Sequence, residues 1–201
     1  MLLMLVSILL FSLMDAGLKT LSAHYPPFQV AALRGASSLP LVLAWALSTV
    51  GWRPLLKVRW PLHLLRGVLG IMMMASFVYA LKRLPLSTAY SIFFVAPLLI
   101  TALSVPILRE RVGPRRWAAI GIGLVGVLVV LRPSGEGVLT TAGFAVLVAA
   151  LGYAVSAITV RVLARTDSTQ AITFWLLAFM ALGAGALAWP DWVPLRAEHA
   201  W

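Results

Sequence analysis

The sequence predicts an all-α integral membrane protein, a multi-helix transmembrane bundle, and three observations lead to this fold class. Apolar residues make up 62% of the 201 residues and charged residues only 11%. The mean hydropathy is +0.99, and long apolar stretches follow one another with short loops between them. Soluble domains contain about 45–50% apolar and about 25% charged residues, and they need polar residues to cover their surface. The composition therefore excludes an ordinary cytosolic enzyme and a disordered chain.

A helix that crosses a bilayer needs about 20 mostly apolar residues, and about seven stretches qualify. The first has no Lys or Arg before Lys19, so we expect a transmembrane helix rather than a signal peptide, whose start is basic. The first and fifth stretches are short, so their bounds are loose. In chain order the expected spans are Leu2–Lys19, Phe28–Val50, Leu62–Leu81, Ser87–Leu108, Trp117–Leu131, Thr141–Val160 and Ala171–Trp189.

Proline interrupts two of the expected spans. Pro40 lies within the second and Pro97 within the fourth, and each removes one backbone hydrogen bond in mid-span. For Pro40 we expect a kink that serves packing. For Pro97, a packing kink and a kink that lines a transport pathway both stay open.

Small residues recur at helical spacing in the last three expected spans. Because lipid is as apolar as leucine, membrane helices associate through close packing, which small residues allow. We therefore expect the glycine face of the fifth span, around Gly123, to contact a neighbouring helix closely. The spacings are Ala119-xxx-Gly123 with Gly126, Gly152-xxx-Ser156, and Ala181-xxx-Gly185.

The 16 Lys and Arg residues, set against 6 Asp and Glu, are divided unevenly between alternate loops. Nine lie in the loops around 51–61, 109–116 and 161–168, and five lie in the other set. Because cytoplasmic loops are enriched in Lys and Arg, this asymmetry predicts a cytoplasmic N-terminus in an inner membrane. Membrane orientation also explains the net charge of +10, so we expect no nucleic-acid partner.

Residue patterns for enzymatic chemistry or metal binding are missing from the sequence. It contains no Cys, which excludes thiolate ligands and thiol nucleophiles. His24, His63 and His199 are scattered without an HExxH arrangement, and neither a nucleotide-binding glycine loop nor a pair of carboxylates within the spans occurs. We therefore expect no enzyme activity, no metal and no cofactor, and an integral membrane enzyme is the least favoured function class.

Two charged residues lie within expected spans at similar depth. With a cytoplasmic N-terminus, Asp15 lies about 7 Å and Arg34 about 9 Å below the outer surface, on helices joined by a short turn at 25–27. A charge inside a span costs about 2.5–3.5 kcal/mol, so it marks function by default. The sequence therefore predicts an Asp15–Arg34 ion pair that opens to bind a substrate carboxylate on Arg34. Arg66 is expected to extend its side chain to the membrane surface.

Aromatic residues form helical stripes on two expected spans. Tyr90, Phe94, Pro97 and Thr101 share one face of the fourth, and Tyr153 and Ser156 share one face of the sixth. Core packing is the usual role of such a stripe, but a buried Tyr hydroxyl needs a partner. Core packing and cavity lining therefore both stay open. The candidate substrate-binding residues are Asp15, Arg34, Tyr90, Phe94 and Tyr153.

Several segments resemble the EamA-type family of drug/metabolite transporters. The strongest similarity lies in residues 80–90 (ALKRLPLSTAY), 109–113 (RERVG) and 129–133 (VVLRP), with the mid-span Pro97 after the first of these. The opening, FSLMDAGLK at 11–19 and YPPFQV at 25–30, is similar as well. Each segment is a weak signal, but their order along the chain makes the match fairly specific.

The resemblance implies ten helices in two inverted five-helix repeats, with a substrate cavity between the repeats. Residues 1–133 would form the first repeat, and residues 138–201 the first two helices of a second, truncated one. Glu110 matches the family's Glu-Arg pair, and we expect it to have a structural role at the end of the fourth span.

The sequence thus favours a multi-pass secondary transporter of small metabolites, such as amino-acid-like compounds, that works by alternating access. With no ATP-binding motif in the sequence, a proton or solute gradient would drive it. The alternative is a half-transporter or fragment that needs a partner chain. The expected partners are a small-molecule substrate and the lipid bilayer, and a homodimer is left open.

Overall fold

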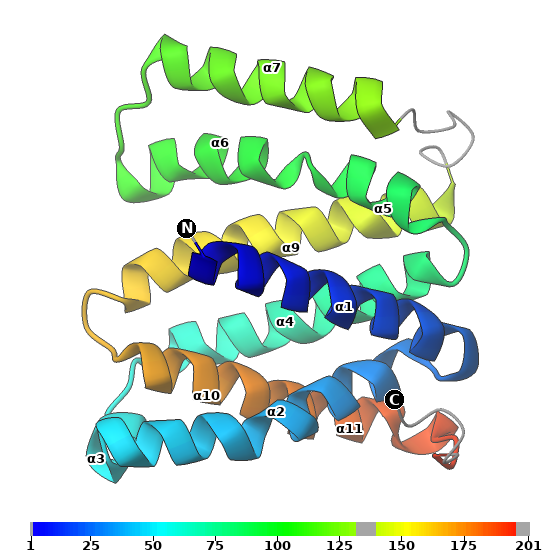
Figure 1. The fold of residues 1–201 in the computed structure, drawn as a ribbon. Coiled ribbons are helices and arrows are strands. Elements are labelled where there is room, and N and C mark those ends of the chain that lie inside the picture. Colours follow the sequence, from blue (N-terminus) through cyan, green and yellow to red (C-terminus); the bar gives the residue numbers. More distant parts are fainter. Residues whose placement is uncertain (1, 132–139, 196–201) are drawn as a thin grey trace.

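The computed structural model describes residues 2–131 and 140–195, and within those ranges every regular element is a helix (Figure 1). The elements are α1 (Leu2–His24), α2 (Pro27–Thr49), α3 (Trp52–Leu56), α4 (Trp60–Leu81), α5 (Leu86–Phe93), α6 (Ala96–Leu108), α7 (Pro114–Leu131), α9 (Thr141–Leu163), α10 (Thr169–Phe179), the π-helical η1 (Met180–Ala184), α11 (Gly185–Ala188) and the 3₁₀ turn η2 (Trp189–Asp191). In Figure 1 the long helices lie side by side and run back and forth across the bundle. The predicted helical bundle is confirmed.

Five helical segments of the described residues are long and apolar enough to cross a membrane. They correspond to the second, third, fourth, sixth and seventh expected spans, and run Pro27–Thr49, Trp60–Leu81, Leu86–Leu108, Thr141–Leu163 and Thr169–Asp191. Helices α1 and α7 cover the first and fifth expected spans but are not among the five. The chain is therefore a multi-span membrane protein, but the structure does not establish seven spans.

Local sequence determines where several helices begin. α2 begins at Pro27, whose missing N–H is one that the start of a helix leaves unbonded in any case. α9 and α10 follow Thr140 and Ser168, whose hydroxyl oxygens accept from the backbone N–H of Gly143 and Ala171 at 3.1 and 3.2 Å. These caps satisfy donors that the first turn of each helix would otherwise leave unpaired.

Glycines let the central helices approach each other closely. A Cβ atom built on Gly35 would lie 2.6 Å from the backbone nitrogen of Ala181, so α2 meets η1 backbone to backbone. A Cβ atom on Gly152 would lie 3.1 Å from the Met72 side chain, which places α9 against α4, as its small-residue spacing predicted. The tightest packing is therefore among α2, α4, α9 and the α10–η1 segment.

The glycine face of α7 does not make the close contact that the sequence predicted. A Cβ atom built on Gly121, Gly123 or Gly126 would meet no atom within 4 Å. Figure 1 shows the reason, because α7 lies at the edge of the bundle, beyond α6. The expectation that Gly123 packs against a neighbouring helix is therefore wrong for the described residues.

The fourth expected span is helical but broken. α5 ends at Phe93 and α6 begins at Ala96, one residue before Pro97, whose ring cannot continue the hydrogen bonding of the preceding turn. By contrast, Pro40 lies inside a continuous α2. The break at residues 94–95 divides the span into two helices that need not share one face.

The loops that are rich in Lys and Arg meet at one end of the bundle. Glu110, just after α6, accepts from the Arg161 guanidinium near the end of α9 at 3.2 Å. The backbone N–H of Arg59, just before α4, donates to the Asp167 carboxylate at 3.1 Å. All three predicted basic loops therefore lie on the same side of the molecule.

The repeat boundary expected between residues 133 and 138 lies outside the described residues, as do Arg132, Arg196 and His199.

Candidate functional site

A pocket of about 220 Å³ opens between helices that are far apart in the sequence. Helices α1, α2, α4, α5 and α9 all contribute to its wall, and apolar side chains surround four residues with polar groups. The residues that line it are Phe11, Met14, Asp15, Leu18, Arg34, Met73, Met74, Phe77, Tyr90, Phe93 and Tyr153. Four of the five candidate substrate-binding residues are thus brought together in one cavity.

Asp15 and Tyr90 connect α1 to α5 across this pocket. The Tyr90 hydroxyl donates a hydrogen bond to a carboxylate oxygen of Asp15, and the Tyr90 ring packs against Phe77 with centroids 6.0 Å apart. Because a carboxylate strengthens the hydrogen bond that it accepts, this contact fixes both polar side chains in the wall. The need of the Tyr90 hydroxyl for a partner, which the sequence raised, is met by Asp15.

Arg34 extends from α2 into the same pocket but makes little use of its donors. Its Nη1 group donates to the thioether sulfur of Met74 at 3.3 Å, which is a weak acceptor. A guanidinium has five N–H donors, and the described residues offer it no other hydrogen bond. Arg34 therefore presents a largely unsatisfied cation to the cavity.

The direct Asp15–Arg34 ion pair that the sequence predicted is not formed, because no nitrogen of Arg34 lies within 4.0 Å of the Asp15 carboxylate. Both residues nevertheless line the same pocket. Tyr90 instead supplies the donor for Asp15. The acid and the base therefore line one cavity without forming an ion pair.

Lys19 does not compete for Asp15 either. Its ammonium group donates to the backbone carbonyl of Leu81 and, at 2.8 Å, to that of Leu84. The Leu81 carbonyl lies at the C-terminal end of α4, where a cation is stabilised by the helix dipole, and Leu84 lies in the connection that follows. Lys19 thus ties α1 to the α4–α5 connection and leaves the pocket to Asp15 and Arg34.

Aromatic rings close one side of the pocket. Phe93 contacts Phe77 and Tyr153, with ring centroids 5.6 and 5.5 Å away. Phe94, the candidate that the helical stripe selected, is 44% exposed and does not line the cavity. Phe94 still lies in the same helical turn as Tyr90, since its N–H donates to the Tyr90 carbonyl at 2.9 Å, so the four-residue spacing was correct but did not show which ring faces the cavity. Phe93, three residues after Tyr90, is the ring that lines the cavity, and helical spacing alone does not distinguish this position from Phe94.

A second polar cluster lies at the basic end of the bundle, where His63 of α4 meets Asp167 of the α9–α10 loop. His63 Nε2 lies 2.8 Å from a carboxylate oxygen of Asp167, and the two side chains are only 1% and 2% exposed. Asp167 also accepts from the Thr166 hydroxyl at 2.6 Å and from the Arg59 N–H at 3.1 Å. Sequence reasoning missed this cluster because its two partners are 104 residues apart.

The ionised form of Asp167 is favoured by these contacts. Burial alone would raise the pKa of the carboxyl, but the hydrogen bonds from Thr166, His63 and the Arg59 backbone hold it below its usual value. With all of these donors directed at it, Asp167 has little capacity left for a ligand. The cluster therefore acts to fasten the α9–α10 loop to the start of α4.

Arg66 does not extend to the membrane surface as the sequence predicted. Its side chain is buried, the residue being 6% exposed, and its Nη1 donates to the backbone carbonyl of Ile172 at 2.8 Å. This carbonyl, near the start of α10, accepts one of the hydrogen bonds that the guanidinium can donate, so Arg66 joins α4 to α10.

Groups of three or more His, Cys, Asp or Glu that could hold a metal ion do not occur in the described part of the chain.

Comparison with known proteins identifies the family. Residues 1–132 match the EamA-like transporter family. The chain is 26% identical over 191 residues to the pseudopaline exporter CntI of Pseudomonas aeruginosa, covering 95% of this chain and 66% of the exporter. It is 35% identical over 126 residues to a riboflavin transporter of Rhizobium johnstonii, covering 63% of this chain and 41% of that protein.

A third relative and a solved structure agree with this assignment. An S-adenosylmethionine uptake transporter of Rickettsia bellii is 34% identical over 137 residues, covering 66% of this chain and 45% of its own. A solved crystal structure of a protein superposes with a TM-score of 0.71 and 25% identity, over 95% of this chain and 68% of that one. The chain thus spans at most about two thirds of the length of these named relatives. Because the family match includes well over half of the chain and all of the helices up to α7, the protein belongs to the EamA-like transporter family.

Proposed function

We propose that the protein takes part in secondary transport of small polar metabolites and that the pocket around Arg34 binds the substrate. The observation that carries the proposal is a cation inside the bundle whose one hydrogen bond is to a thioether. Leaving such a charge unsatisfied is costly, and a ligand with an anionic group removes that cost. The named relatives are an exporter, a riboflavin transporter and uptake transporters, which supports small-molecule transport but no single substrate.

The wall of the pocket suggests the chemical class of the substrate. Arg34 suits a carboxylate, and the carboxylate of Asp15 across the cavity suits an amino group. The aromatic side of the pocket, formed by Phe77, Phe93 and Tyr153, suits an apolar or planar substituent. A small zwitterion with a carboxylate and an amino group, such as an amino-acid-like compound, fits this arrangement.

The proposed mechanism is alternating access in an inner membrane. The basic loops lie at one end of the bundle, and the enrichment of Lys and Arg in cytoplasmic loops supports a cytoplasmic N-terminus. We further propose that the full protein contains two inverted five-helix repeats, the first within residues 1–133 and the second from about residue 138 onward. Substrate would then bind between the repeats, in contact with α1, α2, α4, α5 and α9.

The test is substrate binding and transport by the full-length protein in proteoliposomes. Zwitterionic amino acids, S-adenosylmethionine and riboflavin would be compared as probes for wild type, Arg34→Gln and Arg34→Lys. We expect Arg34→Gln to weaken binding of the transported probe about 10- to 100-fold, because a charge-assisted hydrogen bond contributes about 1.5–3 kcal/mol. Arg34→Lys should restore part of the affinity, since it returns the charge without the planar fork.

Arg83→Gln is the matched control for these variants. Arg83 is an exposed arginine whose guanidinium lies 3.9 Å from the centre of the Tyr79 ring, away from the pocket. It should bind and transport as wild type does. Unchanged binding of every transported probe by a folded Arg34→Gln protein would overturn the proposal.

A further inference from the structure

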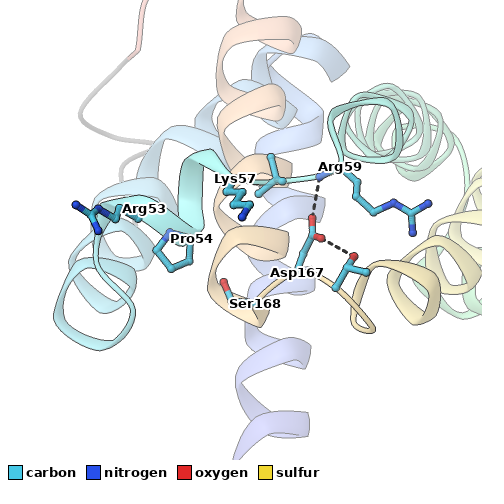
Figure 2. Close-up of a pocket in the computed structure, with 8 residues that line it drawn as sticks. Arg53, Pro54, Lys57, Arg59, Asp167 and Ser168 are labelled. Atoms are coloured by element: carbon cyan, nitrogen blue, oxygen red, sulfur yellow. Dashed lines mark hydrogen bonds between the residues drawn. The ribbon is translucent and has the colours of Figure 1, made fainter.

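A second, larger pocket lies at the basic end of the bundle. Its volume is about 570 Å³, and it lies between the α3–α4 segment and the α9–α10 loop. Figure 2 shows Arg53, Lys57 and Arg59 spread along the α3–α4 segment, with the Arg53 and Arg59 side chains extending to opposite sides and with Asp167 and Ser168 on the other chain segment. None of these residues lines the pocket around Arg34.

The three cations of this pocket have no partner among the described residues. Arg53, Lys57 and Arg59 are all exposed, and none forms an ion pair with another described side chain. The one acid in the wall is Asp167, whose carboxylate already accepts three hydrogen bonds. The pocket therefore has an excess of positive charge that the fold does not neutralise.

The Ser168 hydroxyl in the wall can donate as well, whereas the Thr166 hydroxyl already donates to Asp167. The hydroxyls of Thr166 and Ser168 line the pocket, and Ser168 is the N-cap of α10. The positive end of that helix dipole is thus directed toward the same region as the three cations. A ligand that satisfies this set must be an anion with several acceptor oxygens, as a phosphate group is.

Two exposed tryptophans place the pocket at the level of the lipid headgroups. Trp52 begins α3 and is 59% exposed, and Trp60 begins α4 and is 41% exposed. Tryptophan side chains concentrate at the membrane–water interface, where the ring is in an apolar environment and the N–H reaches water. Between them lies the segment that carries all three cations, so the phosphates of a bilayer are the nearest source of anions.

We propose that this pocket binds the phosphate group of an anionic phospholipid. Arg53, Lys57 and Arg59 contact the phosphate oxygens, while Trp52 and Trp60 flank the glycerol and upper acyl region. Basic pockets between transmembrane helices at the cytoplasmic side hold acidic lipid headgroups in this way. A bound lipid would join α3, the start of α4 and the α9–α10 loop at the membrane surface.

The test is native mass spectrometry of the full-length protein, titrated with phosphatidylglycerol and, separately, with phosphatidylcholine. Wild type should retain phosphatidylglycerol in preference to phosphatidylcholine. The triple variant Arg53→Gln, Lys57→Gln, Arg59→Gln should bind phosphatidylglycerol at least tenfold more weakly, since each cation near the surface contributes to the attraction. The control is the triple variant Arg111→Gln, Arg115→Gln, Arg116→Gln, which removes three exposed cations from the same end of the bundle but outside the pocket. It should bind as wild type does.

Three outcomes would overturn the proposal. Equal weakening in both triple variants would mean that general surface charge attracts the lipid. Displacement of the lipid by millimolar inorganic phosphate or glycerol phosphate would mean that the pocket is a site for a soluble anion. Photoactivatable phosphatidylglycerol, which needs no variant, should crosslink wild type within residues 52–60 or 164–170, and crosslinking only elsewhere would also exclude the site.

Discussion

Asp15 and Asp167 are both sheltered carboxylates, yet their surroundings differ in the number of donors that they meet. Within the described residues Asp15 accepts one hydrogen bond, from the Tyr90 hydroxyl, and it lines a cavity. Asp167 accepts from Thr166, His63 and the Arg59 backbone, and its side chain is 2% exposed. The first cluster retains capacity for a ligand, whereas the second is saturated by the protein itself.

The number of protein donors that a carboxylate meets therefore distinguishes a binding role from a structural role, even when the substrate is unknown. A saturated buried carboxylate holds chain segments together, and removing it leaves its former donors without a partner. A carboxylate beside an open pocket contributes less to the fold and more to what the pocket accepts. Substitutions in the two clusters should therefore affect different measurements.

The largest expected effect is on folding, from Asp167→Ala. This change leaves His63 and the Arg59 N–H without their acceptor, and breaking a buried pair in this way costs about 3–5 kcal/mol. Thermal unfolding in detergent should show a large loss of stability. A variant with near wild-type stability would contradict the structural role of this cluster.

A smaller effect, on transport rather than folding, is expected from Asp15→Asn. The variant keeps the shape of the side chain and a hydrogen bond to Tyr90, but loses the charge that faces Arg34. Binding of an amino-bearing substrate should weaken about tenfold, while the free energy of unfolding changes by less than about 1 kcal/mol. A loss of stability as large as that of Asp167→Ala would remove the distinction between the two carboxylates.

The pH dependence of stability should single out Asp167. Its pKa is lower in the folded protein than the ordinary value of 3.8, so its contribution is fully present above that pH and is lost as the pH falls through the lowered value. The stability gap between wild type and Asp167→Asn should therefore narrow below pH 3.8. The free energy of unfolding of both proteins would be measured at pH values above and below 3.8. A stability difference between them that grows as the pH falls would contradict this prediction.

The smallest effect is expected from Glu110→Gln at a third acidic position. Glu110 pairs with Arg161 at 3.2 Å, but the two side chains are 39% and 51% exposed. Exposed ion pairs contribute about 0–1 kcal/mol, so the change in the free energy of unfolding should stay below about 0.5 kcal/mol. Thermal unfolding beside Asp167→Ala gives the comparison, and a loss above about 2 kcal/mol would show that exposure does not distinguish these acids.

The sequence predicted the helical bundle and most of the pocket for identifiable reasons. Asp15 and Arg34 were placed at the same depth because a short turn joins two regular helices, and this geometry needs no tertiary information. Tyr90 and Tyr153 followed from hydroxyls on apolar helical faces. The predicted Asp15–Arg34 ion pair is not formed, because Asp15 accepts its hydrogen bond from a third residue, Tyr90.

The other failures also have physical causes. Phe94 was selected because it lies four residues after Tyr90, but Phe93 lies three residues after it, satisfies helical spacing equally well and is the ring that lines the cavity. Gly123 was expected to be packed because small residues permit close contact, but they do not by themselves bring a neighbour to α7. The His63–Asp167 cluster depends on a contact between distant segments that local patterns do not contain. Long-range pairing was therefore the information that the sequence reading lacked.

The break within the fourth span has a mechanical consequence. α5 is bound to α1 through the hydrogen bond from Tyr90 to Asp15, and the connection before α5 is bound to α1 through the Leu84 carbonyl and Lys19. Residues 94–95 separate α5 from α6. The contact with α1 therefore restrains the part of the span before residues 94–95 and not the part after them. An eight-residue helix is about 12 Å long, so a tilt of about 15° around its junction with α6 displaces the far end by about 3 Å. Such a pivot would change the width of the cavity while α6 and α7 stay in place.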